Sequence, residues 1–97
     1  MFTLVIVIIS FRHKGLEELF EKGSSGKISH DLKARALRRL DVLNQIEALK
    51  ELHIPGFDLH RLHGKPVRYS IHVNGNFCIT FAWEKGNAID VDLEDYY

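Results

Sequence analysis

Residues 67–97 read VRYSIHVNGNFCITFAWEKGNAIDVDLEDYY, and this stretch decides the fold. Apolar and polar side chains alternate in three successive runs, which is the period of β-strands. Asn74-Gly75 predicts a tight hairpin with positive φ at both central residues, and Glu84–Asn87 predicts the second turn. One face of this meander must be covered, and we expect chemistry on the opposite, polar face. The predicted apolar face comprises Val67, Tyr69, Ile71, Val73, Phe77, Ile79, Phe81, Trp83, Ile89, Val91 and Leu93.

Length and composition restrict the class of protein. The chain has 97 residues, which suits one domain with its own core, so we expect a single domain over residues 1–97. The formal net charge is zero, so any contact with nucleic acid has to come from a local patch. Cys78 is the single cysteine, which excludes an internal disulfide and favours a reducing compartment. The apolar start, Phe2–Ile9, is too short to cross a bilayer and lacks signal-peptide features, so we expect a cytoplasmic protein without membrane contact.

The remaining two thirds of the chain predict a strand and then helices. Residues 2–11 are apolar without alternation, which is typical of a strand in a sheet interior, although part of it could pair along an edge. Helical spacing predicts helices over residues 13–22 and 31–43, with Ser29 as the N-cap of the second. The buried stripe of this second helix is expected to comprise Leu32, Ala36, Leu40 and Leu43.

A short third helix is predicted over residues 45–52, and Pro55-Gly56 ends it. Residues 57–62 are then expected to be extended. This order predicts an α+β domain, in which two to three helices cover one face of a three- to four-stranded, mainly antiparallel sheet.

A run of basic side chains borders the polar face of the predicted sheet. Cations that hold a phosphate, with a histidine or tyrosine that moves a proton, are what a metal-independent ribonuclease needs, because the 2′-OH of RNA is then the nucleophile. The same histidines also fit ordinary exposed polar positions. The run comprises His60, Arg61, His63, Lys65, Arg68 and His72.

Four further features bear on possible functions. The arginines at 35, 38 and 39 form a basic stripe on the second helix, either a solvated face or a contact with an RNA backbone. The acidic residues at 90, 92, 94 and 95 fit an exposed strand face. His60 and His63 should point to opposite faces at strand spacing, so no metal site is predicted. Cys78 fits a small, half-buried side chain better than a nucleophile.

Several segments of the chain resemble one known family. They are residues 9–23 (ISFRHKGLEELFEKG), 59–64 (LHRLHG), 69–73 (YSIHV), 76–81 (NFCITF) and the closing Asp95-Tyr96. Together they resemble the HigB toxins, also known as plasmid maintenance system killer proteins, within the RelE/ParE superfamily. The resemblance covers nearly everything from Ile9 to the end of the chain.

This resemblance implies a RelE/ParE-like fold and a specific activity. Members of the family act as toxins of type II toxin–antitoxin systems and cleave mRNA in the decoding site of the ribosome, without a metal or other cofactor. The resemblance further implies a HigA-type helix-turn-helix antitoxin as partner. That antitoxin neutralises the toxin and, in complex with it, represses their shared promoter, so promoter DNA is contacted only through the complex.

The chain departs from the family pattern at three positions. His63 replaces the usual lysine, Cys78 replaces an arginine that faces the scissile phosphate, and Tyr97 replaces a terminal histidine. Loss of such a charged donor costs about 3 kcal/mol of transition-state stabilisation, roughly a hundredfold or more in rate. Tyrosine in place of histidine moves the intrinsic pKa from about 6.5 to about 10, which makes a poor base at neutral pH.

Two functional hypotheses follow. The first is an active, ribosome-dependent mRNA endoribonuclease. The second is a weakened or inactive homologue that binds the antitoxin and acts as a co-repressor; a gyrase-directed toxin of the same superfamily is a distant third. For the nuclease, the catalytic candidates are His60, Arg68 and Tyr97, the substrate-binding candidates are His63, Lys65, Tyr96 and Asp95, and the RNA-backbone candidates are Arg35, Arg38 and Arg39.

Overall fold

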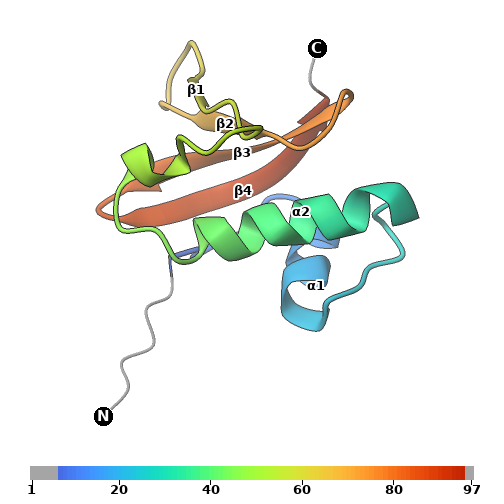
Figure 1. Ribbon diagram of the computed structural model, residues 1–97. Helices are drawn as coiled ribbons and strands as arrows, with labels where there is room; N and C mark the ends of the chain where they lie inside the picture. The colour runs from blue at the N-terminus through green and yellow to red at the C-terminus, as the bar shows by residue number, and fades with distance from the viewer. Residues whose placement is uncertain (1–6, 96–97) are drawn as a thin grey trace.

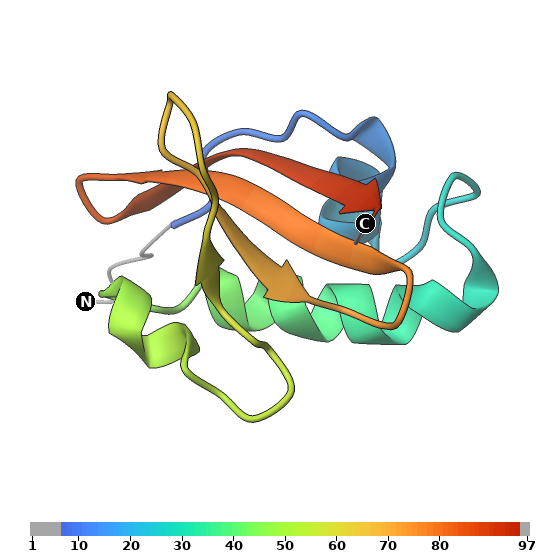
Figure 2. The ribbon, with the colours of Figure 1, turned by 90° about the horizontal axis from the view of Figure 1, so that it is seen from above.

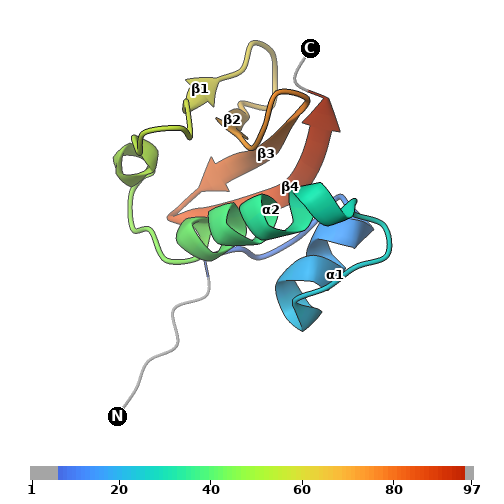
Figure 3. The same cartoon turned by 45° about the vertical axis from the view of Figure 1, so that its right-hand side comes forward.

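A computed structural model describes residues 7–95 and shows helices on one side of a single four-stranded sheet (Figure 1). The strand order is β1-β2-β3-β4, and every neighbouring pair is antiparallel. Both α-helices lie on the same side of the sheet, and the loop between β1 and β2 lies on the other (Figure 3). The predicted α+β class is therefore confirmed. The elements are α1 (Lys14–Lys22), α2 (His30–Leu43), the 3₁₀ helix η1 (Leu49–Leu52), β1 (His60–Arg61), β2 (Tyr69–His72), β3 (Phe77–Glu84) and β4 (Asn87–Asp95).

The two α-helices follow the predicted periodicity closely. In α1, the ring of His13 accepts a hydrogen bond from the Leu16 N–H and so caps the first turn, and Gly23 ends the helix at a φ of 76°. In α2, the four residues of the predicted stripe are at most 3% exposed. Ser29 is the N-cap by position, but its side chain makes no capping hydrogen bond. The stripe of α2 packs into one core with buried residues of β2, β3 and β4.

The predicted third helix is much shorter than residues 45–52. Only η1 forms, with Ala48 as its N-cap. The carboxylate of Glu51 accepts the backbone N–H groups of Glu47 and Ala48, at 2.7 and 2.8 Å, which fixes the helix start close to Pro55. Too few residues remain between this cap and the proline for an α-helix. Ile46 and Leu52 are nevertheless buried as the apolar pattern predicts.

The segment before α1 pairs along an edge of the sheet, so its predicted place in the interior is wrong and the edge alternative is correct. Ile8 and Phe11 form isolated parallel bridges with Ala88 and Val91 of β4, and Figure 2 shows the segment running beside that strand. The side-chain oxygen of Asn44 accepts the N–H groups of Val7 and Ile8. Val7 and Ile8 are buried, but Ile9 is 58% exposed. Residues 2–6 of the predicted strand lie outside the described residues.

A β-bulge in β4 changes which side chains face the core. Thr80 pairs with Asp92 but Ala82 pairs with Ile89, so one extra residue sits in β4 near Asp90, whose φ is 51°. Ile89 therefore shares a face with Ala82, on the polar side, and the core position is taken by Ala88 instead. The predicted alternation of Ile89 with Val91 and Leu93 is wrong at Ile89, because the bulge shifts the register by one.

The positive-φ turn that was predicted at Asn74-Gly75 is wrong, and such a turn forms instead in the second hairpin. Lys85 and Gly86 both have positive φ, 51° and 81°, as a two-residue primed turn requires. Asn74-Gly75 does not: neither residue is in the positive-φ region. The Asn74 side-chain oxygen accepts the N–H groups of Asn76 and Phe77 instead, both at 2.9 Å, which produces a longer Asx-type turn.

Candidate active site

Strand pairing assembles the polar face of the sheet in rows. His60 lies opposite Ser70, Ser70 opposite Thr80, and Thr80 opposite Asp92, so one row crosses all four strands. Directly opposed residues project from the same face. The predicted grouping of β2 and β3 side chains on one polar face is therefore confirmed by the register. A second row contains His72, Cys78 and Glu94.

A cleft of about 520 Å³ opens on this face. Three predicted site residues line it: His60, His63 and Asp95. They come from β1, from the loop after it and from the end of β4, so the fold brings together residues from distant parts of the sequence. The other lining residues are Arg61, Leu62, Ser70, Cys78, Thr80 and Glu94.

A second hollow of about 300 Å³ adjoins the cleft. Lys65 and Arg68, two further predicted site residues, line this hollow and not the cleft. The cleft and the second hollow share Leu62, His63 and Glu94, so they form a continuous concave surface. The remaining lining residues of the second hollow are Arg12, Gly64 and Pro66, the last preceded by a cis peptide bond.

His60 is held in one orientation by the chain before it. Its Nδ1 lies 2.8 Å from the carbonyl oxygen of Asp58 and 3.6 Å from the Asp58 carboxylate. A carbonyl oxygen only accepts, so Nδ1 carries the hydrogen in this bond and Nε2 is the acceptor nitrogen of the neutral ring. Asp58 has a φ of 47°, a turn conformation that aims its carbonyl at the ring. This tautomer is the one that a general base at Nε2 requires.

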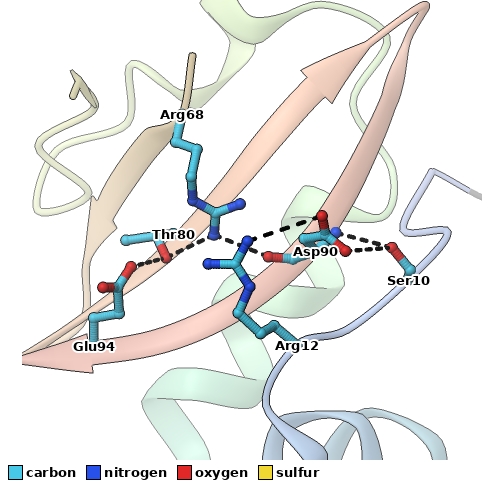
Figure 4. A network of polar contacts seen from close by, with 6 residues as sticks. All are labelled: Ser10, Arg12, Arg68, Thr80, Asp90 and Glu94. Carbon is cyan, nitrogen blue, oxygen red and sulfur yellow. Dashed lines mark hydrogen bonds and ion pairs between the residues drawn. The ribbon is translucent and has the colours of Figure 1, made fainter. Parts of the chain in front are cut away.

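Arg68 is fixed in the second hollow by two hydrogen bonds (Figure 4). Its Nη2 donates to Thr80 Oγ1 at 3.0 Å and to the Asp90 carbonyl at 2.9 Å, at the bulge of β4. Thr80 in turn donates to the Glu94 carboxylate. Burial and the nearby charge of Arg12 lower the pKa of the Arg68 guanidinium. Arg68 thus reaches the bulge rather than the position beside Cys78.

Cys78 contributes a thiol to the cleft wall and is 9% exposed. Burial, and then the charges of Glu94 and Asp95, raise the pKa of this thiol. A thiol with a raised pKa stays protonated at neutral pH and is a poor nucleophile. This agrees with the structural role that the sequence predicts for Cys78.

The predicted RNA-backbone arginines lie on α2, which packs on the core face of the sheet, whereas the cleft opens on the polar face. Arg39 is partly used by the fold: its Nε donates to the His72 carbonyl at 2.7 Å, and its guanidinium lies 4.7 Å from the centre of the Phe57 ring. Arg35 and Arg38 are exposed. Whether the stripe contacts RNA stays a prediction, and a contact there would be separate from the cleft.

Two of the predicted site residues, Tyr96 and Tyr97, lie outside the described residues. Conversely, the sequence did not single out Arg12, Thr80 or Glu94 as site residues. Period-two alternation does put Thr80 and Glu94 on the polar face, but Glu94 had no feature that set it apart from the other strand carboxylates. Arg12 belongs to the family-like segment 9–23 but was not marked as a site residue, because its place depends on the pairing of residues 8–11 with β4.

Two general properties complete the description. Within residues 7–95, no group of three or more histidine, cysteine, aspartate or glutamate side chains is arranged to hold a metal ion. In the same part of the chain, no helix has the length and apolar character needed to span a membrane.

Comparison with known proteins identifies the family. A family model described as "RelE-like toxin of type II toxin-antitoxin system HigB" matches residues 9–96. A relative named Endoribonuclease HigB, from Proteus vulgaris, is 40% identical over 93 residues, which cover 94% of this chain and 100% of the relative. The matched range contains both helices, the whole sheet and every residue that lines the cleft. The chain therefore belongs to the HigB-like family of RelE-like toxins of type II toxin–antitoxin systems.

Proposed function

We propose that this protein is the endoribonuclease toxin of a type II toxin–antitoxin system, and that it cleaves mRNA on the ribosome without a metal ion. Membership of the HigB-like family and the 40% identity to a protein named as an endoribonuclease support the proposal. The observation that carries it is the cleft, which His60 lines and which adjoins a cationic second hollow; the bond of His60 Nδ1 to the Asp58 carbonyl leaves Nε2 as the acceptor nitrogen.

In the proposed reaction the substrate supplies its own nucleophile. The 2′-oxygen of a ribose forms a bond to the adjacent phosphorus while the bond from phosphorus to the 5′-oxygen of the next nucleotide breaks. His60 Nε2 accepts the proton of the 2′-OH, and a protonated group returns a proton to the departing 5′-oxygen. We assign this second role to Tyr97 or His63. The products are a 2′,3′-cyclic phosphate and a 5′-hydroxyl.

Cationic groups stabilise the charge that develops on the phosphate in this proposal. Lys65 and Arg68 lie in the second hollow, next to the cleft. Asp95 lines the cleft and would orient the ribose or a base through hydrogen bonds, with Tyr96 stacking on a base. Preorganised donors of this kind are commonly worth about a hundredfold or more in rate each, so Cys78 in place of an arginine predicts a slower enzyme.

A second candidate function is an antitoxin-binding co-repressor with little nuclease activity. The specific observation in its favour is the wall of the cleft around Cys78, where two carboxylates, Glu94 and Asp95, stand beside an uncharged thiol. Carboxylates at that place oppose the approach of a phosphate unless a cation balances them.

One expression experiment separates the two functions. Wild type, His60→Ala and Cys78→Arg would be induced in a bacterium that lacks the antitoxin, with growth and mRNA cleavage on ribosomes as readouts. Arrest and cleavage by wild type, lost in His60→Ala, support the nuclease. No arrest by wild type, with arrest in Cys78→Arg, means a toxin disarmed at that position. If none of the three proteins arrests growth or cleaves mRNA, and circular dichroism shows that all three are folded, the nuclease is ruled out and the co-repressor remains.

The family also implies a cognate antitoxin. We propose a HigA-type helix-turn-helix protein, encoded next to the toxin, as that partner in the bacterial cytoplasm. Co-expression of the adjacent reading frame should abolish growth arrest and yield a co-purifying complex that binds promoter DNA. An adjacent frame that neither rescues growth nor co-purifies would contradict this partner.

A further inference from the structure

We infer that the second hollow, lined by Arg12, Lys65 and Arg68, is a phosphate subsite that holds a backbone phosphodiester of single-stranded RNA next to the one that reacts in the cleft. The inference rests on the proposed function, because it extends the same RNA strand beyond the reactive bond. It adds Arg12 to the substrate-binding residues. It places Lys65 and Arg68 in contact with the neighbouring phosphate, from where their charges also act on the reactive phosphate in the adjoining cleft.

The first support is the placement of two guanidinium groups against one residue (Figure 4). Arg68 Nη2 donates to the carbonyl oxygen of Asp90, and Arg12 Nη2 lies 3.9 Å from the carboxylate of Asp90. The two arginines come from segments far apart in sequence. The pairing of the N-terminal segment with β4 and the bulge at Asp90 hold them together.

The second support is that positive charge exceeds negative charge in the wall of the hollow. Three cations line it, but Glu94 is the one carboxylate among the lining residues. Burial is the main cause that lowers the pKa of Arg68, and the charge of Arg12 adds to it, while Glu94, Asp92 and Asp90 act in the opposite direction. A bound anion would favour the charged form of Arg68, which burial and Arg12 disfavour.

The third support is an unused hydrogen-bond donor. Arg68 Nη1 is buried and has no hydrogen-bond partner within residues 7–95. A buried donor on a charged group is costly to leave unpaired, and such groups in native proteins usually have an acceptor. Phosphate oxygens are strong acceptors for guanidinium groups and suit several donors at once. Because Nη1 is enclosed by protein atoms, a phosphate oxygen would pair with it only after the Arg68 side chain rotates toward the hollow.

Continuity with the cleft identifies the ligand as RNA. His63, Leu62 and Glu94 belong to both walls, so a strand that enters the cleft passes directly over the hollow. The hollow is small, about 300 Å³, and has no apolar wall to receive a side chain of a protein partner beyond Leu62 and Pro66. A phosphodiester fits both its size and its charge.

The test is a binding titration with a short single-stranded RNA whose 2′-oxygens are methylated, so that no cleavage occurs. Arg12 is the residue to change, because its side chain is 52% exposed and its carboxylate contact is long. We would compare wild type, Arg12→Gln, Arg12→Lys and a charge-matched control, Lys50→Gln. Lys50 is exposed on η1 and lines neither the cleft nor the second hollow. Affinity would be measured at several salt concentrations, with the arginine Nε–H signals followed by NMR.

Loss of one phosphate contact should reduce the slope of log affinity against log salt by about 0.7 for a single strand. We expect this smaller slope in Arg12→Gln, and the reduction should be the same for RNAs of different base sequence. Arg12→Lys and Lys50→Gln should keep slopes close to the wild-type value. The Nε–H signals of Arg12 and Arg68 should shift on titration. Equal effects of Arg12→Gln and Lys50→Gln would overturn the subsite, as would an unchanged slope in Arg12→Gln. A loss of antitoxin binding without any change in RNA binding would likewise overturn it.

Failure of the phosphate subsite can be told apart from failure of the proposed nuclease function. If wild type cleaves mRNA on ribosomes but Arg12→Gln keeps the wild-type salt slope, the subsite fails and the nuclease stands. If wild type does not cleave, the nuclease fails, and the titration still reports whether the hollow binds RNA.

Discussion

Replacing Thr80 by valine should destabilise the protein and disturb the cleft and the second hollow. Thr80 is 2% exposed, accepts a hydrogen bond from Arg68 and donates one to Glu94. Valine keeps the branched shape and the strand preference, so no cavity forms and only the hydroxyl is lost. The change therefore isolates the polar contribution of this side chain.

The magnitude follows from the partners of the hydroxyl. A hydrogen bond to a charged group contributes about 1.5–3 kcal/mol, and Thr80 makes two. Arg68 keeps its bond to the Asp90 carbonyl, and Glu94 is exposed enough to bind water, so we expect a total loss of about 2 kcal/mol. For a domain of this size that corresponds to a fall in Tm of about 10 °C.

Urea denaturation, followed by the fluorescence of Trp83, the single tryptophan, measures this loss directly. The matched control is Ser70→Ala, which removes a hydroxyl from the neighbouring strand position opposite Thr80. Within residues 7–95 the hydrogen bonds that link Arg68, Thr80 and Glu94 do not involve the Ser70 hydroxyl, so its loss should cost less than about 0.5 kcal/mol. A Thr80→Val protein as stable as wild type, or a Ser70→Ala protein equally destabilised, would refute the reasoning.

Three further predictions concern the bulge, the thiol and the sheet edge. Asp90→Asn should strengthen RNA binding severalfold in the methylated-RNA titration, because it removes the carboxylate beside Arg12 while asparagine tolerates the φ of 51°; weaker binding would contradict it. Cys78 should react with iodoacetamide only at a higher pH than an exposed thiol does, because its pKa is raised. The folded protein holds this proton more tightly than the unfolded chain, so the free energy of unfolding should fall as the pH rises above about 8.5, and Cys78→Ser should remove that component. Asn44→Ala should speed amide hydrogen exchange at Ile8 by loss of its acceptor, with about 1 kcal/mol lost for each hydrogen bond, and unchanged exchange would show that the edge pairing alone holds the segment.

The sequence predicted the features that depend on local periodicity. Both α-helices and the core faces of β2 and β3 followed from the spacing of apolar residues, because burial repeats with the period of each element. The stripe of α2 is buried at all four predicted positions. The family resemblance, carried by short segments such as residues 9–23, agrees with the match over residues 9–96.

Features that depend on distant contacts were not predictable in this way. The bulge in β4 depends on the positive φ of Asp90. The N–H of Asp90 donates to the Ser10 hydroxyl at 2.9 Å, and no local sequence pattern marks that contact. The same bulge puts Ile89 on the polar side. Asn74-Gly75 carries a strong signal for a primed turn, yet the Asn74 side chain satisfies the backbone in another way.

The candidate site also contains some features that the local sequence predicts and others that depend on distant contacts. His60 and His63 were predicted from their residue types and Asp95 from the family resemblance, and all three line one cleft. Arg68 was predicted to share a face with Cys78, and the register agrees, but its guanidinium turns toward the bulge because acceptors are available there. Arg12 reaches the second hollow only through tertiary pairing, so its contribution could be found only in the folded molecule.

The pairing of residues 8–11 with β4 also determines when the fold can form during synthesis. Ser10 and Asp90 are 80 residues apart in sequence, and Ile8 bridges to Ala88. Contacts of such long range form late, because the intervening chain must first be closed into a loop. Until β4 has been synthesised, the edge pairing of residues 8–11, the bulge and the second hollow cannot form. Arg12, Arg68 and Asp95 are brought to their places by β4, so the site assembles only after this strand has been synthesised.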